Sequence, residues 1–361
     1  MHEDQKKTNL TRRRFLGASI GTAAGAWALG GGLTTAARGG NGLLVPPGKR
    51  SIILYTVRDR ISAAPDSTGV PYGFEQVLER LAEIGYKGIE FAGYNQSTAI
   101  LGRQITPAEI RKLLDDNGLI AVGSHGNIPG SITDASLAAF DAYMETANIL
   151  GQKYIGTGGD PTGSAYKADW DAAAERWNTL GERAAAAGLK LYTHNHDGAY
   201  NFLLDSGPAD AQGRPTRSSG IRRLEYFLGI SNPEFVHLEM DIYWAHVAQH
   251  RFQTYTAPDG STQTNVFQPL DLVAANTKRY PLFHAKDGAK TGQAPGVGQG
   301  YTMVPLGQGD IDFTMFFKFM GAKGFHYPMY EQDNAPGGSA DPGRSLRFSA
   351  ESYEAMDALR A

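Results

Sequence analysis

Short apolar runs alternate with helix-like segments about eight times between residue 51 and the C-terminus, and this alternation limits the fold more than any other feature. Strands that alternate with helices form parallel sheets, and about eight such units are what a closed barrel requires. We therefore predict an α/β protein with a (β/α)8 TIM barrel. The predicted strands cover residues 51–57, 86–91, 119–124, 153–157, 188–197, 235–241, 280–285 and 325–331.

Residues typical of helix ends lie between several of these runs. Thr106 and Pro107 form an N-cap and a first turn, and Asn117-Gly118 and Gly151 are typical helix ends. Helices are thus predicted between the strands. They cover residues 72–84, 106–117, 134–150, 168–187, 270–278, 313–321 and 350–359, with one more near Ala245.

Three longer connections interrupt the later part of the alternation. Polar stretches cover residues 205–219 and 251–268, and a Gly-rich stretch covers 287–309. The last is too long for a bare connector, so we expect either an active-site loop or disorder there.

The N-terminal residues are predicted to lie outside the barrel. The run Thr11-Arg12-Arg13-Arg14-Phe15-Leu16-Gly17 precedes a weakly apolar, Gly- and Ala-rich stretch, which resembles a twin-arginine export signal. We predict a signal peptide over residues 1–37, a linker over 38–50 and the barrel over 51–361, the alternative for the first part being a basic tail before a short helix. The twin-arginine export machinery is then a partner, and the mature protein is periplasmic or secreted. The stretch is too rich in Gly for a stable membrane anchor.

Composition excludes several other classes of function. The formal net charge is −3, so the chain has no basic footprint for nucleic acid. With 0 cysteines it has no disulfide, no thiolate metal site and no cysteine nucleophile, which leaves His, Asp and Glu as metal ligands. The sequence leaves the oligomeric state open, and a homo-oligomer is compatible with it.

Each of the last four predicted strands ends in a side chain that can bind a metal ion. His194 and His196 end the fifth strand, and Asp241, His284 and Glu331 end the next three. Because barrel strands end at one common mouth, we expect these side chains to converge. Any one of them alone is more simply a hydrogen-bonded group at a loop edge, whereas all together favour a shared site. Carboxylates with imidazole and no sulfur suit Mn²⁺ first, and also Zn²⁺, Co²⁺ or Mg²⁺.

Five short motifs lie at these strand ends. They read Gly88-Ile89-Glu90-Phe91-Ala92-Gly93-Tyr94, His194-Asn195-His196-Asp197, Asp241-Ile242-Tyr243-Trp244, His284-Ala285-Lys286-Asp287 and Glu331-Gln332-Asp333. In their order and spacing, the chain resembles the sugar phosphate isomerase/epimerase family, with its xylose isomerase-like barrel, from about residue 52 onward. The resemblance implies one divalent metal ion held by a strand-five ligand together with Asp241, His284 and Glu331. His194 matches the position where many relatives carry a glutamate, so we expect it to be the fourth ligand.

The chain departs from the family pattern just after His196. Relatives often carry an aromatic-Glu-Phe segment there, whereas this chain reads Gly198-Ala199-Tyr200-Asn201-Phe202. If the missing glutamate contacts substrate in relatives, His196 becomes the proton carrier here. The candidate catalytic residues are therefore His196, Glu331 and Glu90, although Glu90 is equally well explained as a salt-bridged rim residue.

Several further residues are candidates for substrate binding. His125 lies on a small-residue strand face that leaves room for a ligand, and Lys286 could hold an oxyanion or a substrate carboxylate. Trp244 and Tyr94 could stack on a sugar ring, although such aromatics more often pack in walls. Glu239 shares a strand face with Asp241 and is the reserve metal ligand.

The predicted metal site favours chemistry next to a carbonyl group. A divalent ion that chelates a carbonyl and the neighbouring hydroxyl acidifies the C–H between them by stabilising an enediolate. We favour an isomerase or epimerase acting on a sugar or keto-sugar, with a lyase or dehydratase acting on a 3-keto-glycoside as the alternative. A non-catalytic sugar-binding barrel is the alternative from another class, and the acidic balance disfavours an endonuclease.

Overall fold

The computed structural model describes residues 42–291, 300–321 and 326–361. They belong to one compact unit, Gly40–Ala361. The predicted signal peptide lies outside the described residues. Part of the predicted linker packs on the barrel, because the Leu44 amide donates to the Leu359 carbonyl at 3.1 Å and Leu43 bridges to Arg360.

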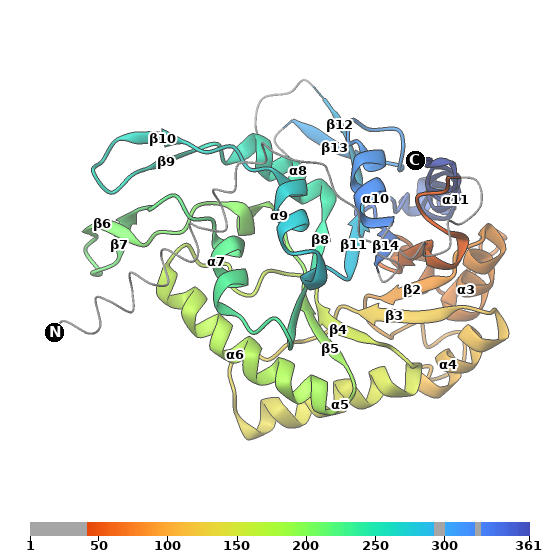
Figure 1. Cartoon of the computed structure of the whole chain (residues 1–361). Helices are drawn as coiled ribbons and strands as arrows, with labels where there is room; N and C mark the ends of the chain where they lie inside the picture. The colour runs from red at the N-terminus through yellow and green to blue at the C-terminus, as the bar shows by residue number, and fades with distance from the viewer. Residues whose placement is uncertain (1–41, 292–299, 322–325) are drawn as a thin grey trace, which may run out of the picture. The chain divides into compact units, whose positions relative to one another are not determined.

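Eight parallel strands form a nearly closed barrel, which confirms the predicted (β/α)8 fold (Figure 1). Their order in the sheet is β3-β2-β1-β14-β11-β8-β5-β4, and β3 and β4 meet through a single bridge between His125 and Gly156. The strands are β1 Ser51–Ile53, β2 Gly88–Phe91, β3 Ile120–Ser124, β4 Tyr154–Thr157, β5 Lys190–Thr193, β8 Val236–Asp241, β11 Leu282–Ala285 and β14 Tyr327–Tyr330.

Helices follow most of the strands and pack their apolar faces against the outside of the barrel. The predicted capping of α4 is confirmed, since the Thr106 hydroxyl accepts from the Glu109 amide and Glu109 binds back to the Thr106 amide. Gly151 ends α5 in the left-handed conformation at φ +74°. The helices are α2 Arg58–Ile61, α3 Gly73–Ile84, α4 Pro107–Asp116, α5 Asp134–Leu150, α6 Lys167–Ala186, α7 Arg223–Ile230, α8 Ile242–Arg251, α9 Pro269–Ala275, α10 Phe313–Gly321 and α11 Arg344–Ala358.

Several predicted boundaries differ from the observed ones. The first strand ends at Ile53 and not at residue 57, because the amides of Thr56 and Val57 bond back into a turn that leads to α2. Strand β11 begins after Pro281, which has no N–H to donate to a ladder. Helix α11 begins at Arg344, six residues before the predicted start.

The long connections contain antiparallel hairpins. The two polar stretches hold β6 Ser206–Ala209 with β7 Pro215–Arg217, and β9 Thr254–Thr256 with β10 Thr262–Thr264. The described ends of the Gly-rich stretch pair as β12 Asp287–Lys290 with β13 Tyr301–Val304, and residues 292–299 lie outside the described ranges. These connections therefore have secondary structure of their own, which the sequence interpretation missed.

The barrel interior has its own apolar cluster, separate from the larger core beneath the helices. It consists of Val122, Tyr154, Tyr192, Leu282 and Met329, all buried. This cluster packs the barrel interior below the strand ends. Within the described ranges, no helix has the length and apolar character needed to cross a membrane.

Candidate metal centre and cavity

Four buried side chains from neighbouring strands converge at the C-terminal mouth of the barrel. They are His194 just after β5, Asp241 at the end of β8, His284 in β11 and Glu331 just after β14. One potential ligand atom from each lies within 4.8 Å of all the others. The sheet order explains the convergence, because β5, β8, β11 and β14 are adjacent and His284 pairs directly with Asp241.

Specific atoms of these four side chains face one another. The Nδ1 atom of His284 lies 2.9 Å from Oε2 of Glu331 and 4.0 Å from Oδ2 of Asp241. The Nε2 atom of His194 lies 3.7 Å from the same Asp241 oxygen. Two nitrogens and two carboxylate oxygens of this kind form a donor set that suits Mn²⁺, Zn²⁺ or Co²⁺.

Lys286 supplies a positive charge beside this group. Its buried Nζ lies 3.1 Å from Asp241 Oδ2, 2.8 Å from Glu331 Oε2 and 2.9 Å from Asp333 Oδ1. Burial lowers the pKa of Lys286, but the three carboxylates outweigh it and raise the pKa above its ordinary value. Burial also raises the pKa of Asp241 to about 7, although Lys286 opposes this. A nearby positive charge therefore stabilises the ionised carboxylates of this group. A divalent cation would do the same.

The two oxygens of Asp241 have different partners. Oδ2 faces Lys286 and the two histidines, whereas Oδ1 accepts a hydrogen bond from the Trp244 amide at 2.9 Å. Asp241 is therefore the N-cap of helix α8 as well as a candidate ligand.

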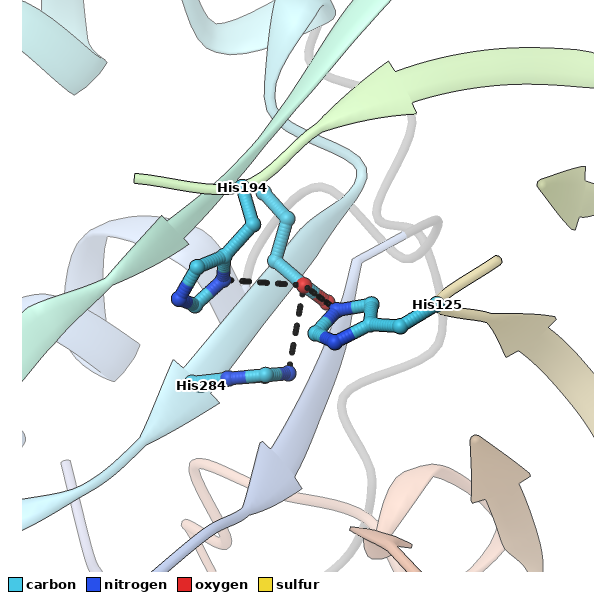
Figure 2. A group of neighbouring side chains, drawn as sticks. His125, His194 and His284 are labelled. Carbon is cyan, nitrogen blue, oxygen red and sulfur yellow. Dashed lines mark hydrogen bonds and ion pairs between the residues drawn. The ribbon is translucent and has the colours of Figure 1, made fainter. Parts of the chain in front are cut away.

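A second polar layer lies beneath the first, around Glu239 in the middle of β8. Figure 2 shows His125, His194 and His284 converging on this carboxylate from three strands. Oε2 of Glu239 lies 2.8 Å from His125 Nε2, 3.2 Å from His194 Nδ1 and 3.1 Å from His284 Nε2. These three histidines and Glu239 are also close enough to hold a metal ion.

Glu90 belongs to this deeper layer and not to the mouth, where the sequence interpretation placed it. It is fully buried, accepts a hydrogen bond from the Tyr192 hydroxyl and lies 2.8 Å from His284 Nε2. It is not among the residues that line the cavity. Burial, followed by the nearby Glu239, raises the pKa of Glu90.

A cavity of about 370 Å³ opens above the four converging side chains. It is lined by Tyr55, Ala92, His125, Gly158, His194, His196, Lys286, Glu331 and Asp333. A second cavity of about 460 Å³ adjoins it at Ala92, over the ends of β1, β2 and β14. Its walls are Leu54, Arg58, Asp59, Ile61, Ser62, Ala92, Gly93, Asn95 and Pro336.

The structure separates His196 from His194. His196 is exposed and lines the cavity, and its ring centre lies 5.2 Å from that of His194 and 5.5 Å from that of Trp244. Its backbone amide donates to Asp160 Oδ1 at 3.0 Å, which fixes the start of the following turn. The His196 ring can therefore contact a ligand in the cavity that lies above the four buried candidate metal ligands.

Of the two aromatic residues predicted to stack on a sugar, one lies near the site and the other does not. Trp244 lies beside the site, with Lys286 Nζ 5.4 Å from its ring centre. Tyr94 lies apart, because its ring packs on Phe91 and its hydroxyl accepts from Gln152 at 3.0 Å. Neither Trp244 nor Tyr94 lines the cavity.

The sequence matches the family model described as the xylose isomerase-like TIM barrel over residues 78–350. The chain belongs to this family. Among curated proteins, no match was found.

Solved structures share the fold of the family at low sequence identity. A sugar phosphate isomerase/epimerase from Parabacteroides distasonis is 21% identical, with a TM-score of 0.59 over 86% of this chain and 94% of that one. The probable 3-DHS dehydratase AsbF from Bacillus anthracis is 14% identical, with a TM-score of 0.55 over 85% and 97%. The 3-keto-D-glucoside 4-epimerase YcjR from E. coli is 14% identical, with a TM-score of 0.50 over 85% and 98%.

Two cavity residues of this family member, Tyr55 and Asp333, were not assigned a role from the sequence. Glu239 was expected only as a reserve metal ligand, and the structure shows it in contact with three histidines. Asp333 stands within a motif that was noticed, and the position of Glu239 on the face of Asp241 was a usable signal. Tyr55 had none, because it lies in the turn that replaces the end of the predicted first strand.

Proposed function

We propose that this protein is a divalent-metal-dependent isomerase or epimerase that acts on a sugar or keto-sugar through an enediolate. The observation that carries the proposal is the convergence of His194, Asp241, His284 and Glu331 beside a cavity that the first and last of them line. Family membership agrees with it, and the similar structures include proteins titled as isomerases and epimerases.

The four converging residues fit the proposed ion. They would hold it through His194 Nε2, His284 Nδ1 and one oxygen each of Asp241 and Glu331. When bound, a divalent ion polarises a carbonyl oxygen and acidifies the neighbouring C–H.

The chain's own residues would then move the proton. His196 lines the cavity without a side-chain hydrogen bond to any described residue, so its imidazole is free to take a proton from substrate carbon and return it. Lys286, between Glu331 and Asp333, would orient a substrate oxygen at the cavity wall.

Turnover of a substrate panel tests the proposal. Purified protein with Mn²⁺ would be incubated in deuterated water with free ketoses and with 3-keto-glycosides. The products would be separated and their masses measured by mass spectrometry. We expect a product of unchanged carbon skeleton with deuterium at the reacting carbon. Binding of sugars without turnover would instead identify a sugar-binding barrel.

Elimination from a 3-keto-glycoside is the second candidate, and the adjoining cavity favours it. That cavity meets the first at Ala92 and is the larger of the two, so it offers space for a leaving group attached to the reacting ring. Stoichiometric release of a second fragment in the same panel would identify the protein as a lyase. An Asn95→Trp variant, which fills the second cavity, should then lower kcat/KM for a glycoside and not for a free ketose.

We also propose export by the twin-arginine route, on the strength of the arginine run that begins at Arg12. Replacing both Arg12 and Arg13 with lysine should leave folded protein in the cytoplasm. Normal export of the double variant, measured by cell fractionation, would contradict the proposal.

A further inference from the structure

Glu239 meets the two candidate metal-ligand histidines on the side away from the cavity. Its Oε2 atom lies 3.2 Å from His194 Nδ1 and 3.1 Å from His284 Nε2. The other nitrogen of each ring lies nearest to the carboxylates of the upper layer, His194 Nε2 to Asp241 and His284 Nδ1 to Glu331. Each ring therefore lies between a lower and an upper carboxylate.

This arrangement has a consequence for the proton on each ring. A neutral imidazole donates from one nitrogen and offers a lone pair from the other, and a carboxylate only accepts. At His194, Glu239 is the nearer carboxylate, at 3.2 Å from Nδ1 against 3.7 Å between Nε2 and Asp241, so it favours the proton on Nδ1. The lone pair of His194 then lies on Nε2, the nitrogen that faces the proposed ion. At His284, carboxylates lie within hydrogen-bonding distance of both nitrogens, so Glu239 favours a proton on Nε2 without removing the one on Nδ1.

We propose that Glu239 is a positioning residue that fixes the tautomer of His194 for metal binding and orients the ring of His284 from its far side. This inference rests on the proposed metal dependence. His125 shares the same oxygen at 2.8 Å, so one carboxylate also holds a histidine of the cavity wall. A carboxylate behind a metal-bound histidine commonly orients the ring and increases its basicity. Here a single carboxylate serves two rings of the same site.

The alternative is that Glu239 is itself a metal ligand with these histidines. One observation argues against it: Oε2 already lies within hydrogen-bonding distance of three ring nitrogens. A catalytic ion needs an open position toward substrate, and in the upper group the carboxylate of Glu331 lines the cavity, whereas Glu239 does not.

The two lower carboxylates differ in a way that gives a matched control. Glu90 also lies 2.8 Å from His284 Nε2, whereas no contact between Glu90 and His194 is present among the described residues. Removing the charge of Glu90 should thus leave the His194 tautomer intact. Removing the charge of Glu239 should disturb it.

The experiment measures tautomers and metal affinity in the same proteins. Histidine labelled with ¹⁵N would report the protonated nitrogen by NMR in metal-free wild type, Glu239→Gln and Glu90→Gln. We expect His194 to carry its proton on Nδ1 in the wild type and in Glu90→Gln, and to become mixed in Glu239→Gln. Titration with Zn²⁺ should show affinity about 10 to 100-fold weaker in Glu239→Gln.

Three results would overturn the inference. One is a wild-type spectrum with the His194 proton on Nε2, which needs no variant and so does not depend on the folding of Glu239→Gln. The second is unchanged tautomers and affinity in Glu239→Gln. The third is complete loss of Zn²⁺ in Glu239→Gln with an unchanged His194 tautomer, which would make Glu239 a ligand. Absence of isomerase activity with the expected tautomers and affinities would overturn the proposed function alone.

Discussion

The upper and lower halves of the barrel interior are built from the same strands and have opposite character. Toward the mouth, β8 and β11 contribute Glu239, Asp241 and His284, each with charged or hydrogen-bonding neighbours. Toward the bottom, the same strands contribute His237, whose ring nitrogens have no hydrogen-bond partner among the described residues, and the apolar Leu282. Inward-facing residues only two positions apart on one strand, such as Leu282 and His284, therefore belong to the apolar cluster and to the polar site respectively.

This difference separates stability from function within one sheet. Inward side chains two residues apart share a face of the strand, so each strand presents both halves in register with its neighbours. The lower cluster holds the strands together, and the upper layers hold the charged groups at fixed separations. Substitutions in the upper half should therefore affect metal binding and rate, and substitutions in the lower half should affect the free energy of unfolding.

The largest effect is expected from Asp241→Asn in the upper half. The variant loses one of two ligand carboxylates but keeps a good N-cap for α8, so we expect a folded protein without tightly bound metal or measurable turnover. Metal content by elemental analysis is the measurement, with the exposed Asp259→Asn as the control. Full metal occupancy in Asp241→Asn would show that Asp241 is not a ligand.

His196→Ala should give the next largest effect and should act on rate alone. Because His196 lines the cavity above the buried group, its loss should lower the rate by about 10² to 10⁴-fold, as for a positioned acid or base, with metal near stoichiometric. His194→Ala is the matched variant and should lose metal. The reverse pattern would exchange the roles of the two histidines.

A substitution in the lower half should affect stability without affecting the site. Leu282 is fully buried in the interior cluster, so Leu282→Ala should lower the free energy of unfolding by about 2 to 5 kcal/mol. Urea unfolding of the metal-free protein measures this, with the exposed Leu101→Ala as the control. If metal affinity fell as well, the two halves would not be independent.

The smallest effect concerns the pH dependence of stability through His237. Burial, together with the nearby Lys190 and Arg279, lowers the pKa of His237 to about 4. The unfolded chain, with an ordinary pKa of about 6.5, then takes up a proton that the folded protein does not, so stability falls as the pH drops through this window by at most about 1.4 kcal/mol per unit.

His237→Gln removes this contribution. Relative to wild type, the variant should therefore gain stability as the pH drops from about 6.5 to 4. Urea unfolding at a series of pH values measures the difference. Parallel profiles for the two proteins would contradict a neutral buried His237.

The sequence was sufficient for the barrel and for the convergence of the four candidate ligands, because strand periodicity and strand order determine where strand ends meet. It was not sufficient for the layer beneath them. Glu90 and Glu239 lie in strands 149 positions apart in the chain, and only the closed sheet shows that both carboxylates lie beside His284. The hairpins β6–β7 and β9–β10 were missed because their polar strands carry no apolar alternation, which is the signal that predicts a strand.

The double use of Asp241 links the occupancy of the site to the motion of a helix. One oxygen holds the first turn of α8 through the Trp244 amide, while the other faces the site. A ligand that restrains the second oxygen also restrains the first, so the backbone amides at the start of α8 should exchange with solvent more slowly when the site is filled. Binding at the site could then be followed by amide exchange in the N-terminal turn of helix α8. It should also change the fluorescence of Trp244, which lies in that turn.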